Sequence, residues 1–282
     1  MKRTKVWITG AEGAVGTMLT QMLDCLDVEL LPTNRDVDVT SLEKISLFAD
    51  VNHPDIIINC AALTGLQRCE ENLELAYKVN ALGARNVSVA ARKANAKVIH
   101  LSTDDVFSGV SGQVYNEFDA TCAASVYGRS KLAGEAFVRE LNPKHMIVRS
   151  AWTYGIRGDN FVRSLLEQAR TSEVIRVAGD QVGSPTSAKE LARLIIHLMD
   201  TNEYGVYHAV CQGTCTRAEF ARAVLDRTGY SGIQVEAVPA EALGQQPSNI
   251  LLDNLMLRLT GDYVMPRWED ALDEFAQDWQ HR

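Results

Sequence analysis

One tyrosine and one lysine stand four residues apart in a segment with helical periodicity. The segment spans residues 125–141, so Tyr127 and Lys131 are expected on one face of a helix. An ammonium group near a phenol stabilises the phenolate and lowers the pKa of the phenol. Such a pair can exchange a proton with a carbonyl oxygen. The spacing therefore predicts that Tyr127 is a general acid with Lys131 beside it.

Two hydroxyl groups end an apolar run that is typical of a buried strand. The run covers residues 97–102, and Ser102 and Thr103 stand at its carboxyl end. Open α/β sheets bind their ligands at the carboxyl ends of their strands. Thr103 is therefore expected to donate a hydrogen bond to the same carbonyl oxygen. Ser and Thr also cap turns, and that alternative stays open for both residues.

Three glycines follow the first apolar run and open a helical segment. Gly10 suits a tight turn, Gly13 lets a pyrophosphate approach the backbone, and Gly16 permits close helix packing. A glycine turn can also be purely structural, but its place between the first strand and the first helix favours dinucleotide binding. The expected cofactor-binding residues here are Gly10, Glu12, Gly13, Ala14, Val15 and Gly16.

The second apolar run, at residues 28–31, lacks the acidic residue that usually contacts an NAD ribose. The loop after it carries Arg35 instead, which could pair with the 2′-phosphate of NADPH. A solvated surface arginine is the equally weighted alternative. Asp38 and Val39, just beyond, are expected at the adenine edge. The sequence therefore leaves NADPH and NADH both open and leans towards NADPH.

Short apolar runs alternate with helical segments over the first 150 residues. Such alternation predicts an α/β fold, a Rossmann-like doubly wound parallel sheet. Later turn-rich segments around 154–160 and 179–186 predict a smaller substrate lobe. We expect residues 1–150 and 188–230 in the dinucleotide-binding domain and 151–187 and 231–282 in the lobe. The expected strands are 5–9, 28–31, 55–60, 97–102 and 145–149, and the expected helices 13–25, 41–51, 72–94, 125–141, 161–170 and 188–201.

Composition narrows the class of partner. A formal net charge of -8 disfavours nucleic acid or an anionic membrane as partner, because both require a concentrated basic face. Eighteen consecutive apolar residues occur nowhere, and the apolar run near the start is too short for a signal peptide. A cytoplasmic protein is expected. Six cysteines are scattered, and Cys211 and Cys215 lack a second ligand pair at zinc spacing, so no metal site is expected.

Several longer motifs occur in a fixed chain order. On them the sequence resembles the dTDP-4-dehydrorhamnose reductase family of extended short-chain dehydrogenases/reductases, over nearly the whole chain. Besides the glycine turn, the motifs are Asn59-Cys60-Ala61-Ala62-Leu63-Thr64, Val79-Asn80, Ser102-Thr103-Asp104, Tyr127-Gly128-Arg129-Ser130-Lys131-Leu132-Ala133-Gly134-Glu135, Arg149-Ser150-Ala151-Trp152-Thr153-Tyr154-Gly155 and Asp180-Gln181-Val182-Gly183-Ser184-Pro185-Thr186.

The resemblance implies a reaction and the residues that perform it. The implied activity is NAD(P)H-dependent reduction of the C4 keto group of a nucleotide-linked 6-deoxy sugar, with dTDP-4-dehydro-L-rhamnose as the favoured substrate and dTDP-L-rhamnose as product. A nucleotide sugar is then the expected partner, and a homodimer is left open. By likeness, the catalytic residues are Thr103, Tyr127 and Lys131, and the substrate contacts Thr103, Asp104 and Trp152. The resemblance also implies that Ala61, Tyr127 and Lys131 bind the cofactor and that Ala62, Leu63 and Thr64 line the nicotinamide side.

Two departures from the family pattern bear on the substrate. Asp105 replaces the usual aromatic residue, and Gln246-Pro247 stands where the family has Arg-Pro. They predict either altered recognition of the diphosphate or sugar, or neutral change at packing positions. The open alternatives are a reductase or epimerase of another nucleotide sugar, and a non-catalytic NADP-binding regulatory subunit.

Overall fold

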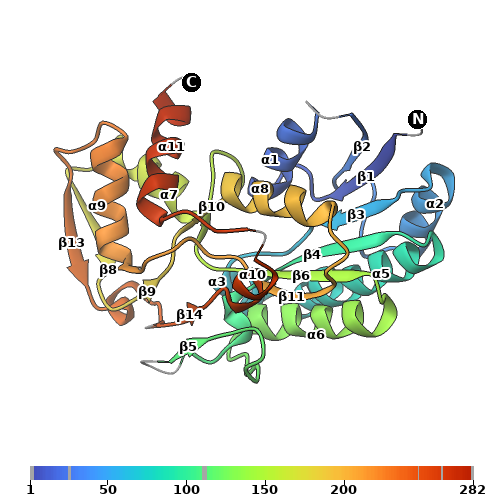
Figure 1. Cartoon of the computed structure of the whole chain (residues 1–282). Coiled ribbons are helices and arrows are strands. Elements are labelled where there is room, and N and C mark those ends of the chain that lie inside the picture. The colour runs from blue at the N-terminus through green and yellow to red at the C-terminus, as the bar shows by residue number, and fades with distance from the viewer. Residues whose placement is uncertain (1–2, 25–26, 110–112, 247, 262, 281–282) are drawn as a thin grey trace.

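The centre of the protein is a six-stranded parallel sheet (Figure 1). The computed structural model describes residues 3–24, 27–109, 113–246, 248–261 and 263–280. All five neighbouring strand pairs in the sheet are parallel, as the alternating pattern predicted. The strand order is β11 (Gly205–His208), β6 (His145–Ser150), β4 (Lys97–Thr103), β3 (Ile56–Asn59), β1 (Thr4–Thr9) and β2 (Val28–Thr33).

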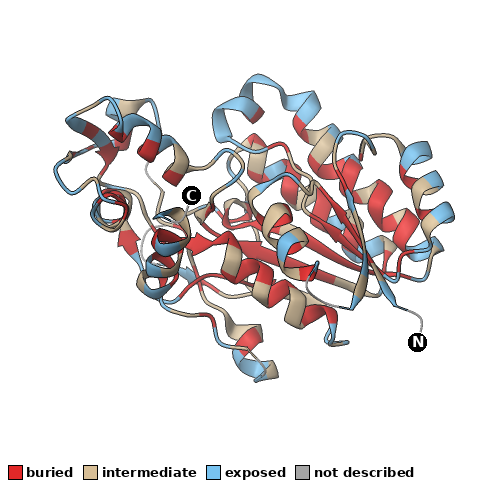
Figure 2. Ribbon diagram, turned by 90° about the horizontal axis from the view of Figure 1, so that it is seen from above, coloured by how far each residue is buried: buried red, intermediate tan, exposed pale blue. Residues whose placement is uncertain are grey.

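Helices cover both faces of this sheet. Val6 and Ile8 pack towards the face covered by α1 (Ala14–Leu23) and α8 (Ala188–Met199). Trp7 lies between them in the strand and packs on the opposite face, because successive strand residues point to opposite sides. That face is covered by α2 (Leu42–Asn52), α5 (Gly83–Lys93) and α6 (Val126–Leu141). Viewed from above, the central strands are almost uniformly buried (Figure 2).

The expected strands and helices are confirmed, although one expected helix is divided, and the structure holds several elements that were not predicted. The strand β11 and the short helix α3 (Leu66–Glu71) were not predicted. The helix expected over 72–94 is instead α4 (Leu73–Ala76), a π-helical segment (Tyr77–Leu82) and α5 in succession. Cys25, the expected last residue of the first helix, lies outside the described residues.

A second group of elements lies beside the sheet, at the left of Figure 1. Its helices α7 (Phe161–Ala169) and α9 (Arg217–Arg227) contact β8 (Val174–Ala178), and β8 pairs in parallel with β13 (Gln234–Val238). Helix α11 (Trp268–Gln280) packs on α9. One apolar core continues from the sheet into this group through Tyr154, Phe220 and Phe275. The expected division of the chain into two domains remains a prediction.

Short elements complete the chain. The paired strands are β5 (Val114–Tyr115) with β14 (Leu251–Leu252), β7 (Thr153–Tyr154) with β10 (Thr186–Ser187), and β9 (Val182–Gly183) with β12 (Cys215–Thr216). The remaining helical turns are Asp104–Val106, Ala240–Leu243 and α10 (Leu255–Thr260). Among the described residues, no helix combines the length and the apolar character that crossing a membrane requires.

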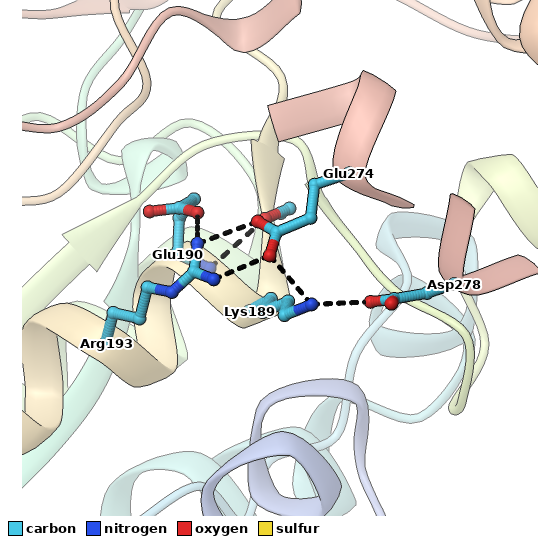
Figure 3. A network of polar contacts seen from close by, with 6 residues as sticks. Lys189, Glu190, Arg193, Glu274 and Asp278 are labelled. Carbon is cyan, nitrogen blue, oxygen red and sulfur yellow. Dashed lines mark hydrogen bonds and ion pairs between the residues drawn. The ribbon is translucent and has the colours of Figure 1, made fainter. Parts of the chain in front are cut away.

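An ion-pair network joins α11 to α8 (Figure 3). Glu274 on α11 accepts from Arg193 at 2.6 Å and lies 2.8 Å from the ammonium nitrogen of Lys189. Lys189 also contacts Asp278 at 2.7 Å, and Arg193 contacts Glu190. The network therefore ties the second group of elements to a helix that covers the sheet.

Candidate active site

Helix α6 is pressed against the end of β4. Its N-cap residue Ser125 accepts a hydrogen bond from the Gly128 nitrogen at 2.9 Å, which fixes the start of the helix. A Cβ atom at Gly128 would lie 2.0 Å from the Asp105 carbonyl oxygen, so only glycine allows this approach. The approach places Tyr127 close enough to Thr103 for the threonine hydroxyl to influence the pKa of the phenol. Two of the three predicted catalytic residues thus lie side by side.

The Thr103 hydroxyl is the centre of a small acidic cluster. It lies 3.0 Å from an Asp104 carboxylate oxygen and 3.4 Å from one of Asp105, and it accepts from the Asp105 nitrogen at 3.2 Å. Burial raises the pKa of Asp104 to about 8, with the neighbouring Asp105 adding to the rise. Burial also raises the pKa of Asp105. One proton shared by these carboxyls near neutral pH relieves their repulsion.

The predicted effect of Lys131 on Tyr127 is wrong in this structure. Burial, followed by the charges of Asp105 and Asp104, raises the pKa of Tyr127, and the Thr103 hydrogen bond opposes the rise. Lys131 donates to the Leu101 carbonyl oxygen instead. Burial lowers the pKa of Lys131 to about 8, against the opposing influence of Glu135. A phenol with a raised pKa stays protonated at neutral pH, which suits a proton donor rather than a base.

The glycine turn has the geometry that its sequence predicted. Gly10 has φ +66°, and a Cβ atom there would lie 2.7 Å from the Ala61 nitrogen. A Cβ atom at Gly16 would lie 2.3 Å from the Gly10 carbonyl oxygen. Gly13 is the N-cap of α1 and makes no side-chain capping bond, so the first backbone N–H groups of that helix face the turn. These residues fit a dinucleotide, because its pyrophosphate needs N–H donors and space at a helix start.

The loop after β7 borders the same turn. A Cβ atom at Gly158, whose φ is +73°, would lie 2.9 Å from the Ala14 nitrogen. At Gly155 the corresponding distance to the Ala14 Cβ atom is 3.4 Å. Ala14 and the buried Val15 therefore lie beside this loop at the start of α1, whereas Glu12 is exposed in the turn.

The predicted adenine-side residues lie beyond β2. Arg35 is exposed in that loop, where its guanidinium is accessible to a ligand phosphate. Asp38 accepts from the Thr40 nitrogen at 2.9 Å and from the Thr40 hydroxyl at 2.9 Å, so its side chain already stabilises a turn. Val39 is buried, and its carbonyl oxygen accepts from Asn86 at 2.9 Å. Asp38 and Val39 thus shape the loop that carries Arg35.

A buried asparagine holds the predicted nicotinamide loop against α6. Asn80 accepts from the Leu63 nitrogen at 2.8 Å and donates to the Leu63 carbonyl at 3.0 Å and to the Ser130 hydroxyl at 2.9 Å. Leu63 is buried, Ala61 and Ala62 are partly buried, and Thr64 is exposed. The sequence assigned no role to Asn80, because its position depends on the π-helical segment.

Trp152 lies between the sheet and the second group of elements. Its φ of 45° is unusual for a bulky residue and marks local backbone strain. The backbone of Gly183 packs against the indole, since a Cβ atom there would lie 2.4 Å from the ring. The Arg217 guanidinium lies over the ring, 3.4 Å from its centroid. Arg217 was missed by sequence reasoning, because nothing near it in the chain indicates that it reaches this site.

Comparison with known proteins finds relatives along the whole chain. The family described as RmlD substrate binding domain matches residues 4–281. The spore coat polysaccharide biosynthesis protein SpsK of Bacillus subtilis is 34% identical over 280 residues, covering 98% of each chain. A dTDP-4-dehydrorhamnose reductase from Clostridium acetobutylicum is 38% identical, with a TM-score of 0.94 over 98% of this chain and 100% of that one.

A further structure shares the fold with a cofactor bound. The dTDP-4-dehydrorhamnose reductase of Bacillus anthracis, in complex with NADP, is 37% identical. It has a TM-score of 0.95 and covers 98% of this chain and 99% of that one. The agreement includes both the sheet and the second group of elements. The chain therefore belongs to the RmlD substrate binding domain family.

Proposed function

We propose that this protein is an NAD(P)H-dependent reductase of the C4 keto group of a nucleotide-linked 6-deoxy sugar. The proposed substrate is dTDP-4-dehydro-L-rhamnose and the proposed product dTDP-L-rhamnose. The observation that carries the proposal is the placement of Tyr127 beside Thr103, with Lys131 on the same helix, at the carboxyl edge of a parallel sheet. The named reductases among its relatives support the same reaction.

The chain's own residues would supply and control the proton. A bound nicotinamide cofactor supplies a hydride for the C4 carbon. Tyr127 gives its phenolic proton to the C4 oxygen, so the carbonyl becomes a hydroxyl and the phenol a phenolate. Thr103 positions that oxygen through its hydroxyl. Lys131, held at the Leu101 carbonyl one helical turn from Tyr127, would hold the ribose hydroxyls of the bound cofactor.

The cofactor would be held by the glycine turn, by the loop after β2 and by the loop after β3. Backbone N–H groups from Gly13 to Gly16 suit the pyrophosphate, and Arg35 suits a 2′-phosphate. The loop from Ala61 to Thr64, fixed by Asn80, would border the nicotinamide. These roles predict that NADPH binds at least as tightly as NADH, and that Arg35→Ala removes any advantage of NADPH. Clearly tighter NADH binding that Arg35→Ala leaves unchanged would contradict this cofactor assignment.

The test is turnover of a panel of 4-keto nucleotide sugars. NADPH and NADH oxidation is followed at 340 nm, a wavelength characteristic of the reduced nicotinamide, and the product sugar is identified by NMR. We expect reduction of dTDP-4-dehydrorhamnose. Exclusive turnover of another nucleotide sugar would favour the reductase or epimerase alternative. NADP binding without any turnover would favour a regulatory subunit. A cytoplasmic location and a homodimer remain predictions, the latter testable by light scattering.

A further inference from the structure

Arg217 differs from Arg149 and Arg193 in that its guanidinium has no polar partner among the described residues. Within the described residues, its guanidinium makes neither a hydrogen bond nor an ion pair, and only its backbone nitrogen is bonded, to Gln181. Arg149 is bonded to both oxygens of Glu135, and Arg193 to both oxygens of Glu274. The Arg217 side chain is partly exposed, so its unused donors can be reached from solvent. Such a group indicates a ligand that completes it.

The surroundings of this guanidinium place it in the candidate active site. It lies 3.4 Å from the centre of the Trp152 ring and 4.8 Å from that of Phe161. Burial lowers the pKa of Arg217 to about 10, and the charges of Asp104 and Asp105 oppose that decrease. The residue therefore stays cationic at neutral pH. The charges of the two carboxyls act on the guanidinium, yet it makes no ion pair with either of them.

Helix stability does not explain a cation at this position. Arg217 is the first residue of α9, where the positive end of the helix dipole disfavours a positive charge. The helix start is already satisfied by a capping box between Thr216 and Glu219. Neither capping residue contacts the guanidinium. Replacing Arg217 should therefore leave α9 as stable as before.

We propose that Arg217 binds the diphosphate group of the nucleotide sugar, an inference that rests on the reductase function proposed above. A planar guanidinium held flat on an aromatic ring keeps its N–H donors directed outwards, in the geometry that suits two phosphate oxygens. Asp104 and Asp105 would otherwise repel a diphosphate from this site. Arg217 offsets that repulsion. It also fixes the position of the diphosphate group, the part of the substrate that is remote from Tyr127.

The test separates binding from catalysis. The dissociation constants of dTDP, thymidine and NADPH are measured by calorimetry for the wild type, Arg217→Met and Arg217→Lys. Arg222→Met is the matched control, because it removes one positive charge from an exposed position on the same helix. Charge-assisted hydrogen bonds of this kind correspond to a loss of about 10- to 100-fold in affinity.

The expected pattern is specific to the phosphates. Arg217→Met should weaken dTDP binding by about 10- to 100-fold. It should raise the KM of the nucleotide sugar by a similar factor and leave kcat nearly unchanged. Arg217→Lys should recover part of the loss. Thymidine binding, NADPH binding and the thermal midpoint of Arg217→Met should match the wild type. Arg222→Met, which loses a hydrogen bond to the Val235 carbonyl oxygen, should match the wild type in all three dissociation constants.

Three outcomes overturn the inference. They are unchanged dTDP affinity in Arg217→Met, an equal loss for thymidine, or a loss of kcat with KM unchanged. Unchanged affinity in an enzyme that still reduces the 4-keto sugar overturns the Arg217 assignment alone. Conversely, Arg217-dependent dTDP binding without turnover of any 4-keto sugar supports the assignment and overturns the proposed reductase.

Discussion

Two clusters of charged side chains lie at the carboxyl end of strand β4, and they are built differently. Ser102 donates to Glu135 at 2.6 Å, and Arg149 bonds the same carboxylate at 2.9 and 2.7 Å. The hydroxyl of the next residue, Thr103, contacts Asp104 and Asp105 instead. The first cluster, Ser102–Glu135–Arg149, uses both oxygens of its carboxylate. In the second, Asp104–Asp105–Arg217, no described residue is a polar partner of the guanidinium.

The difference separates a structural role from a ligand-binding one. A buried ion pair with all its hydrogen bonds made fixes one arrangement of β4, β6 and α6, and nothing remains for a ligand to bind. Charges that face one another without pairing keep a high free energy until a ligand arrives. The first cluster, Ser102–Glu135–Arg149, therefore holds in place the elements that carry the site. The second, Asp104–Asp105–Arg217, forms part of the site.

The largest effect is expected from a substitution in the candidate active site. Tyr127→Phe removes one phenolic oxygen and keeps the ring in place. Loss of a positioned general acid lowers the rate by about 10²–10⁴-fold. We expect that decrease in kcat for the 4-keto sugar, with NADPH affinity and the thermal midpoint close to wild type. Steady-state kinetics with calorimetry decide it, and turnover at the wild-type rate would reject Tyr127 as proton donor.

Breaking the saturated cluster should affect stability rather than chemistry. Arg149→Met leaves Glu135 buried without its bidentate partner, which typically destabilises a protein by about 3–5 kcal/mol. Arg139 contacts the same carboxylate at 2.7 Å from a side chain that is 42% exposed. Arg139→Met is therefore the control and should cost less than about 1 kcal/mol. Urea unfolding measures both, and equal losses would show that Glu135 does not depend on Arg149.

These two clusters also show where sequence reasoning succeeds. The apolar runs predicted the central strands because strands covered on both faces must be apolar throughout. The order of the glycine turn, Thr103 and the Tyr127–Lys131 pair predicted the site because parallel strands end at one edge. Helix packing brought Tyr127 to Thr103, as expected from that order.

The features that the sequence did not predict depend on contacts between distant segments. Lys131 bonds Leu101 rather than acting on Tyr127, because packing of α6 against β4 decides its partner. Strand β11 is short and half polar, so its apolar signal is weak. Arg217 stands in an ordinary capping-box sequence, and only tertiary folding carries it to Trp152. No local pattern encodes such a contact.

The Asp104–Asp105–Arg217 cluster should make the free energy of unfolding decline as pH rises. The pKa of Asp104 rises from 3.8 to about 8 on folding, so the folded state holds more protons over that interval. Its contribution to the free energy of unfolding therefore declines as pH rises from about 4 to about 8. Asp104→Asn cannot titrate, so the difference in stability between wild type and variant should fall across that range. Denaturant unfolding at several pH values tests this, and parallel curves would exclude Asp104 as the titrating group.

The smallest effect is expected in the network between α8 and α11, where the charges are paired but partly exposed (Figure 3). Glu274 contacts Arg193 and Lys189, and their charges lower its pKa to about 2. Glu274 is 31% exposed, so solvent screens the network. Glu274→Gln should therefore cost only about 1 kcal/mol. The cost should shrink as salt rises, because added ions screen the wild-type pairs.

The exposed pair of Lys93 and Asp50 provides the matched control for that substitution. Its side chains are 62% and 48% exposed, so Asp50→Asn should change the free energy of unfolding by only a few tenths of a kcal/mol. Both variants are compared with the wild type by urea unfolding at low and high salt. A loss for Glu274→Gln as large as that for Arg149→Met would mean that solvent does not screen the α8–α11 network. Burial would then no longer explain why the Ser102–Glu135–Arg149 cluster contributes more to stability than the partly exposed ion pairs do.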